Sequence, residues 1–180
     1  MSENWSPLVR ISARNGLIAG LLGFVLLLGL YFMGKHPFLF PIYFDFRLFL
    51  FGIFLVITLR EIRDNQEGIL FFWQGMIACF LFTILFAAIS SGLIGIYAWL
   101  NPAFLQNYIT TAIEQMKSIP EEAIKQIGKD VYESNLKALP ATNGLDMSFH
   151  YLWQSFIISF FLSIIISVIL RRQPPIDSKE

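Results

Sequence analysis

The stretch LFFWQGMIACFLFTILFAAISSGLIGIYAWL, residues 70–100, decides the fold of this chain, because it contains no charged residue. A helix needs about 20 mostly apolar residues, at about 1.5 Å each, to cross a hydrocarbon core of about 30 Å. This stretch meets that condition. Its tryptophans Trp73 and Trp99 would be separated by about 39 Å along a helix, which suits rings seated in the two membrane interfaces. The stretch therefore predicts a membrane-spanning helix.

Three further apolar runs predict spans at about residues 15–33, 42–59 and 149–170. The 180-residue chain is 56% hydrophobic and 14% charged, whereas soluble domains carry about 25% charged residues. Its formal net charge is zero, which argues against a nucleic-acid partner. We therefore expect residues 1–180 to form a single all-α membrane domain, an integral membrane bundle of four transmembrane helices.

Arginine placement predicts how the chain is threaded. Six of the seven arginines lie at one set of ends of the four runs, namely Arg10, Arg14, Arg60, Arg63, Arg171 and Arg172. Short basic flanks remain on the cytoplasmic side of a membrane. A fifth span after Leu100 would move the last two arginines outside, so we end the third span there. The pattern predicts a multi-pass protein of the bacterial inner (cytoplasmic) membrane with both termini in the cytoplasm.

Residues 101–148 then form an outer, extracytoplasmic segment between the third and fourth spans. Apolar residues recur at three- and four-residue steps from Leu105 to Met116 and again from Ile124 to Leu139. Ser118 and Pro120 between them are typical of a helix stop followed by a new start. The segment is predicted to be an amphipathic helical pair. Its apolar stripes either pack on each other or on the bilayer surface, or dock a protein partner.

Small residues mark the expected helix contacts within the membrane. Gly16 and Gly20 are four residues apart in the first span, and the fourth span carries a serine ridge of Ser155, Ser159, Ser163 and Ser167. Small side chains let helix backbones approach closely, so a helix-packing role is the first interpretation, and a homo-oligomer is conceivable. The alternative is a serine-lined path in a small oligomeric transporter or channel.

Charged and metal-ligating residues give no recognisable site. Asp45 is expected to cap the second span, with Arg47 reaching outward to water. His36 and His150, with Asp45 and Asp146, could act on lipid or hold zinc, but their spacing matches no ligand motif. Cys79 lies within an apolar run. No catalytic residue, cofactor or metal is predicted. Trp153 is expected level with Trp99.

Six stretches together carry a family resemblance: NWSPLVRISARNGLIAGLLG, MGKHPFLFPIYFDFR, LREIRD, FWQGMI, IGKDVYESNLKALPATN and QSFIISFFLSIIISVILRRQP. The chain resembles the domain-of-unknown-function family 4199, small four-span membrane proteins of Bacteroidota. The resemblance implies four spans in the inner membrane of a Gram-negative bacterium and supplies no site residues. The leading hypothesis is an uncharacterised, non-enzymatic membrane protein whose outer helical pair contacts a partner or the bilayer surface.

Overall fold

The computed structural model describes residues 5–39 and 45–173, with side chains from residue 7 onward. The described residues are all-α, with seven α-helices and two short 3-10 helices. The long helices are α1 (Trp5–Phe32), α2 (Phe46–Asn65), α3 (Phe72–Leu100) and α7 (Gly144–Leu170). The shorter elements are η1 (Pro37–Leu39), α4 (Pro102–Lys117), α5 (Glu121–Ile127), α6 (Lys129–Ala138) and η3 (Leu139–Ala141).

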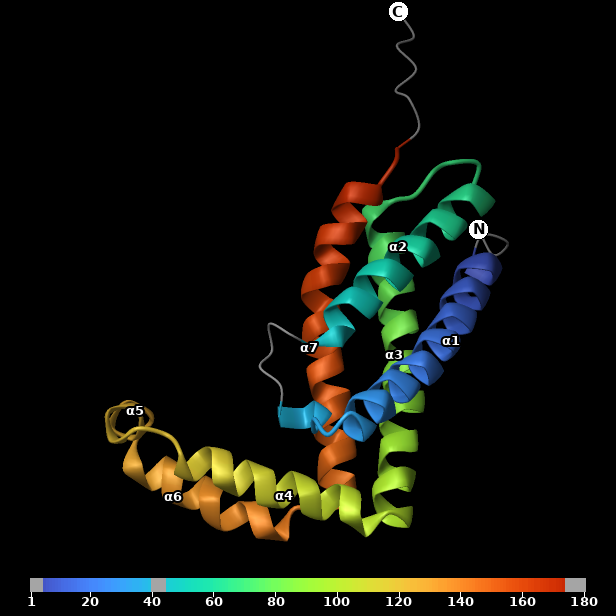
Figure 1. Cartoon of the computed structure of the whole chain (residues 1–180). Helices are drawn as coiled ribbons and strands as arrows, with labels where there is room; N and C mark the ends of the chain where they lie inside the picture. Colours follow the sequence, from blue (N-terminus) through green and yellow to red (C-terminus); the bar gives the residue numbers. More distant parts are fainter. Residues whose placement is uncertain (1–4, 40–44, 174–180) are drawn as a thin grey trace, which may run out of the picture.

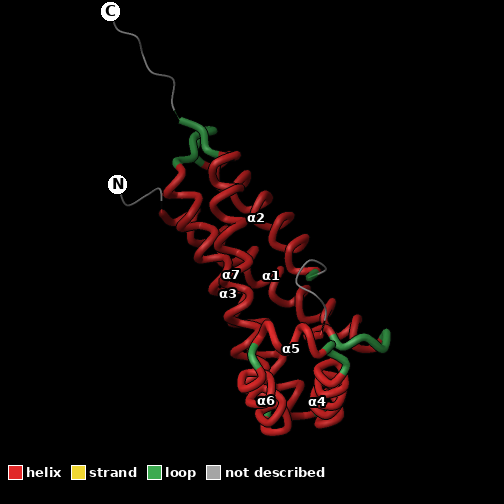
Figure 2. The backbone as a smooth tube through the Cα atoms, turned by 90° about the vertical axis from the view of Figure 1, so that its left-hand side faces the viewer, coloured by secondary structure: helices red, strands yellow, loops and turns green. Residues whose placement is uncertain are grey.

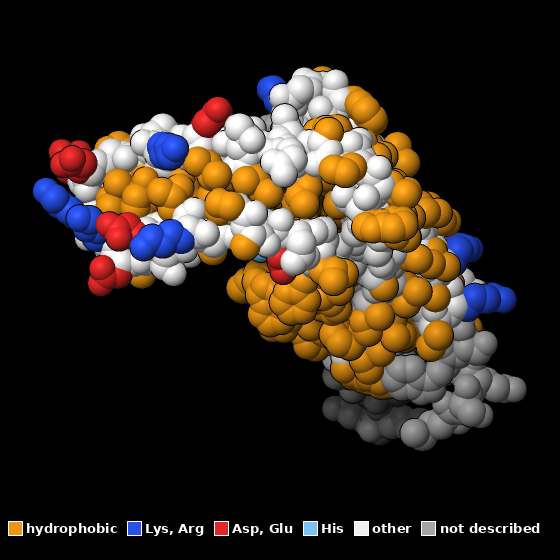
Figure 3. All heavy atoms as spheres, turned by 90° about the horizontal axis from the view of Figure 1, so that it is seen from below, with side chains coloured by type: hydrophobic (Ala, Val, Ile, Leu, Met, Phe, Trp, Pro, Cys, Tyr) orange, Lys and Arg blue, Asp and Glu red, His pale blue; other side chains and the backbone are white. Residues whose placement is uncertain are grey.

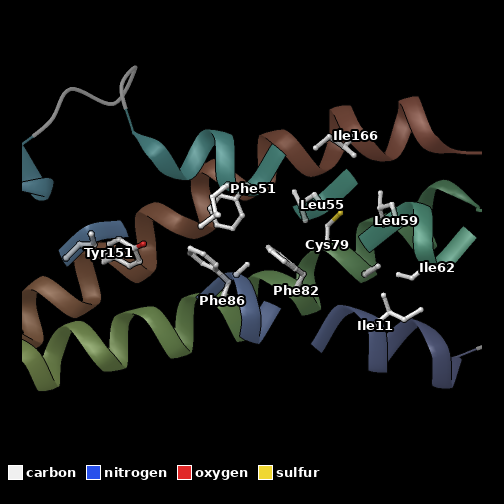
Figure 4. Packing of buried hydrophobic residues seen from close by; sticks show 14 of the residues in the cluster. Ile11, Phe51, Leu55, Leu59, Ile62, Cys79, Phe82, Phe86, Tyr151 and Ile166 are labelled. Carbon is white, nitrogen blue, oxygen red and sulfur yellow. The ribbon is translucent and has the colours of Figure 1, made fainter. Parts of the chain in front are cut away.

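The four long helices pack as a bundle in which α3 contacts both α1 and α7, and α2 closes the ring between them. Each runs antiparallel to the one before it, so that α1 begins and α7 ends at the same end of the bundle (Figure 1). Buried side chains from all four helices fill the centre, including Phe51, Leu55, Phe82 and Phe86 (Figure 4). Large apolar side chains on the outside of the same helices remain exposed, as in proteins whose surface faces lipid.

Three helices in the described ranges are long and apolar enough to cross a membrane: Pro7–Phe32 of α1, α3 and α7. They indicate a multi-pass membrane protein. The second predicted span, 42–59, has a different outcome. Its first residues lie outside the described part of the chain, α2 continues to Asn65, and charges occupy its first and last turns. Four spans are therefore not confirmed by length and composition.

Helix ends differ from the predicted spans where capping groups lie outside the apolar run. The α7 helix begins at Gly144, five residues before the predicted 149, because the Asn143 side chain accepts hydrogen bonds from the amides of Leu145 and Asp146. The α1 helix begins at Trp5 and includes Arg10 and Arg14, whereas the predicted span began after them, at residue 15. The end of α3 at Leu100 agrees with the prediction, since Pro102 starts a new helix.

Three helices form an arm at the end of the bundle opposite the start of α1 and the end of α7. The α4 and α6 helices lie side by side and extend away from the bundle, with α5 at the far end (Figures 1 and 2). The second outer helix was predicted as continuous, but Gly128 divides it into α5 and α6. The φ angle of Gly128 is 97°, and residues with a side chain rarely adopt such a backbone conformation. The arm is therefore a pair in which one member is bent.

Contacts between α3 and α7 correct the predicted level of Trp153. The Ser148 hydroxyl lies beside Gly95, and the Thr83 and Ser159 hydroxyls are hydrogen-bonded. Trp153, about midway between Ser148 and Ser159, thus lies opposite a residue near 89. That position is about 15 Å along α3 from Trp99. The expectation that the two tryptophans share a level was wrong, because it assumed that α7 begins near residue 149.

The predicted topology arginines gather at the end of the bundle opposite the arm. The α2 helix ends there with Arg60 and Arg63, beside the start of α1 with Arg10 and Arg14. Arg14 forms an ion pair with Glu61 at 2.5 Å. Arg171 and Arg172 follow α7, and the backbone of Arg172 pairs with that of Leu70 through two hydrogen bonds of 2.9 and 2.8 Å. We call this the arginine-rich end.

Candidate functional site

A buried ion pair at the start of α2 is the most polar feature inside the bundle. Asp45 is the N-cap of α2, because its carboxylate accepts a hydrogen bond from the Arg47 amide at 2.9 Å. The Arg47 Nε donates to the same carboxylate at 2.9 Å. Arg47 is only 5% exposed. The cap predicted for Asp45 is confirmed, but it is coupled to a buried cation.

The Arg47 guanidinium also bonds to α7. Its Nη1 donates to the Tyr151 carbonyl at 3.2 Å and the Ser155 hydroxyl at 3.3 Å. Its Nη2 donates to Asp45 and to Gln154 Oε1, and its carbon lies 4.4 Å from the centre of the Tyr151 ring. A guanidinium has five N–H groups, and these partners are sufficient to use all of them. The ion pair therefore joins α2 to α7 and has no donor left for a ligand.

The expectation that Arg47 reaches outward to water was wrong. It treated the first turn of α2 as the edge of the bundle. The structure instead places Arg47 beside Tyr151 and Ser155, about two to three turns along α7. At that depth water is replaced by polar groups of α7. Gln154 was the sequence signal that could have indicated this, because an amide within an apolar run needs a partner.

Gln154 connects the ion pair to His150. The Gln154 Nε2 lies 2.8 Å from His150 Nε2. Because Gln154 Oε1 accepts from Arg47, its Nε2 is the donor, and His150 Nε2 must be the acceptor. His150 is consequently neutral, with its proton on Nδ1, when this chain of hydrogen bonds is complete.

His36 lies in a separate, aromatic environment. Rings of Tyr31, Phe38, Phe104 and Tyr108 surround it, with centres between 4.7 and 5.9 Å away. The imidazole is 6% exposed, and neither nitrogen makes a hydrogen bond with the described residues. Burial lowers the pKa of His36 to about 4, and the backbone of Phe104 offsets only a smaller part of that effect. We call this group the His36 cage.

The residues considered for zinc do not meet in one place. His36 is enclosed by rings, whereas His150 bonds to Gln154 and Asp45 bonds to Arg47. The Asp146 carboxylate accepts a hydrogen bond from the Asn143 amide at the start of α7. Across residues 5–39 and 45–173, no three of His, Cys, Asp and Glu are grouped as metal ligands would be. The four residues thus have separate local partners.

The serine ridge lies in the contact between α7 and its neighbours. All four of its serines are buried. Ser159 bonds to Thr83, and Ser167 lies beside Cys79 and Gly75. Ser159 and Ser163 also line the floor of an outward-facing cleft of about 290 Å³, whose walls include Phe80, Phe156 and Phe160. That apolar lining suits a lipid tail better than a polar solute.

Gly16 and Gly20 lie against α3. A Cβ added at Gly16 would come within 2.6 Å of the Phe82 carbonyl oxygen, and one at Gly20 within 3.1 Å of the Phe86 carbonyl oxygen. The Ser90 hydroxyl donates to the Gly20 carbonyl at 2.8 Å. These glycines therefore bring α1 and α3 of the same chain close together.

The arm presents the second candidate site. Tyr132 of α6 donates from its hydroxyl to the Met116 carbonyl of α4 at 3.3 Å, so the pair is joined near its far end, where α4 ends and α6 begins. Figure 3 looks at the arm-bearing end of the molecule and shows an apolar stripe along the arm, with charged side chains at its edges. Near the far end, Ile127 is 52% and Val131 50% exposed. The two helices thus cover each other only in part.

Comparison with known proteins gives one match. A family model described as "Protein of unknown function (DUF4199)" matches residues 14–172. No curated protein matches the chain, and no solved structure does.

Proposed function

Because this chain belongs to the DUF4199 family, whose function is unknown, we propose one from the structure. The protein is a four-span protein of the bacterial inner membrane that has no catalytic role. It presents the α4–α6 arm to a protein partner on the outer side. The observation that carries this proposal is the apolar stripe on the arm, which faces away from the bundle.

Four spans are supported by the outward face of α2. Phe49, Ile53 and Ile57 recur every fourth residue and are all exposed, which suits a helix in contact with lipid. The apolar part, Leu48 to Leu59, covers only about 18 Å. The η1 turn lies beside the start of α2, is half-buried in the protein, and covers part of the membrane thickness that α2 alone does not cover. Non-helical backbone is tolerated at membrane depth when protein covers it. Arginines at the opposite end favour a cytoplasmic location for both termini.

A protein partner is favoured over the bilayer surface by charge and by direction. In this topology the bilayer lies on the bundle side of the arm, whereas the stripe in Figure 3 is seen from the other side. Helices that lie on anionic lipid are usually rich in basic residues. The arm instead carries both signs: Lys117, Lys125, Lys129 and Lys137 with Glu114, Glu121, Glu122, Asp130 and Glu133.

Neither transport nor catalysis gains support from a specific contact. The serine ridge packs against α2 and α3, and the cleft that Ser159 and Ser163 help to line is mostly apolar, so a polar path along α7 gains no support. The hydrogen-bonding groups of the Arg47 guanidinium are occupied by Asp45 and by residues of α7, so they are not available to a substrate. A structural role for these groups agrees with a protein that acts by contact.

A photo-crosslinking amino acid at Ile127, introduced into the full chain in native membranes, tests the docking surface. We expect one adduct of defined mass that reaches saturation. Val131→Asp should abolish it by placing a charge in the apolar contact, whereas Asp130→Asn, on the neighbouring edge, should retain it. Crosslinking to lipid alone, or an adduct that Val131→Asp leaves intact, would refute the proposed surface.

A further inference from the structure

The His36 cage lies at the root of the arm. Tyr31 belongs to α1 and Phe38 to η1, whereas Phe104 and Tyr108 belong to α4. Phe104 is completely buried, and its ring centre lies 4.7 Å from that of His36 and 4.9 Å from that of Tyr31. The imidazole is therefore packed between the bundle and the first helix of the arm.

We propose that His36 is an acid-sensitive latch: its neutral ring holds the root of the arm against the bundle, and a proton on that ring releases α4. A latch of this kind would regulate the docking arm, and this role rests on the proposed function. The release of α4 itself does not require a partner.

Apart from the Phe104 backbone, which offsets a smaller part of the burial effect, the cage offers no group that would replace water around a charged imidazole. Titratable groups facing it are Tyr31 from α1 and Tyr108 from α4. Burial raises the pKa of Tyr108 above its ordinary value, so this phenol remains neutral. Asp146 and His150 of α7 line a pocket together with Phe38 and Tyr108, and His36 is not among the residues that line it.

Aromatic faces attract cations, and this effect opposes the latch. Four rings at 4.7 to 5.9 Å do not provide the hydrogen bonds that an imidazolium obtains from water. The pKa of about 4 in the cage, against 6.5 for a solvated histidine, agrees with desolvation as the larger effect. The cage is most stable above pH 6.5, and its stability falls as the pH decreases towards 4.

Hydrogen exchange on the purified full chain in lipid nanodiscs tests the latch. Between pH 6.0 and pH 4.5, linkage with these two pKa values predicts a loss of about 20-fold in the protection factors of α4 amides. The Ser155–Ser167 stretch of α7 should keep its protection. In His36→Phe the α4 protection should be independent of pH, whereas His150→Gln should respond like the wild type.

Two results would overturn the latch: α4 protection that does not fall with acid in the wild type, and an equal fall in His36→Phe. If His36→Phe does not fold, the imidazole NMR signal of the wild type decides. A His36 titration midpoint below 5 supports the latch, and one near 6.5 refutes it. These readouts need no partner, so failure of the latch is distinct from failure of the docking surface.

Discussion

Arg47 shows how one charge can be stable inside an apolar bundle. Its carboxylate partner is two residues away, and the other acceptors belong to Gln154, Ser155 and the Tyr151 backbone. Removing one partner of a buried pair leaves an uncompensated charge, which costs far more than losing an exposed pair. Arg47 is therefore the residue whose loss should loosen α2 from α7.

Arg47→Met should lower the free energy of unfolding by about 3–5 kcal/mol, because Asp45 is left buried without its cation. Arg14→Met is the control. Its ion pair with Glu61 is largely exposed and should contribute less than about 1 kcal/mol. Unfolding in mixed detergent–dodecyl sulfate micelles, followed by tryptophan fluorescence, measures both.

The double variant Asp45→Asn/Arg47→Met refines this prediction. Removing both charges should cost less than Arg47→Met alone, because no unpaired charge remains. Equal losses for Arg47→Met and Arg14→Met would show that Arg47 is not part of a buried pair.

At the residue scale, local roles were predictable from sequence and distant ones were not. The Asp45 cap follows from a carboxylate directly before Phe46, the first residue of α2. The inward direction of Arg47 depends on acceptors more than 100 residues away in the chain. The same applies to His36, whose cage includes Phe104 and Tyr108 of α4. No local pattern in the sequence encodes such pairings.

At the scale of elements, contact between α1 and α3 depends on residues without side chains. Gly16 lies where a Cβ would be 2.6 Å from a backbone oxygen of α3, whereas Gly29 of the same helix has nothing within 4 Å. The two glycines thus allow the effect of packing to be separated from that of helix propensity.

Gly16→Ala should destabilise the bundle by about 1–3 kcal/mol, since α1 and α3 must move apart. Gly29→Ala should be neutral or stabilising by up to about 1 kcal/mol, since alanine is the better helix former. The same unfolding measurement compares them. Similar effects of the two substitutions would contradict close packing of α1 on α3.

Element boundaries were predictable where apolar runs meet helix-breaking residues. The end of α3 at Leu100 follows from Asn101 and Pro102. The bend at Gly128 was missed because the apolar spacing continues through it from Ile124 to Leu136. Periodicity reports the face of a helix, whereas a single residue with positive φ interrupts it without changing the spacing.

At the scale of the whole molecule, the apolar runs and the arginines predicted the antiparallel arrangement of the long helices. They did not predict how far one helix is shifted along another. The antiparallel arrangement and the gathering of arginines at one end agree with the charge pattern. The level of Trp153 was wrong because it depends on the register between α3 and α7. That register is set by Gly95–Ser148 and Thr83–Ser159 contacts. The lateral arm could not be foreseen either, since amphipathic helices fold back or extend according to tertiary contacts.

The orientation of the bundle in the membrane is the feature on which the proposed location of the arm depends. With the start of α1 in the cytoplasm, the charged end of α2 at Asp64 also lies in the cytoplasm, because Arg14 pairs with Glu61, and the arm lies outside. In the inverted orientation, Asp64 lies outside and the arm lies in the cytoplasm. The two arrangements thus place the same two positions on opposite sides.

Labelling of intact spheroplasts with a membrane-impermeant maleimide distinguishes these arrangements most directly, with single cysteines introduced at Lys125 or Asp64 in a Cys79→Ser background. We expect Lys125→Cys to be labelled at once and Asp64→Cys only after the membrane is permeabilised. Labelling of Asp64→Cys in intact spheroplasts, with Lys125→Cys protected, would contradict the cytoplasmic location of the arginine-rich end and the outer location of the arm.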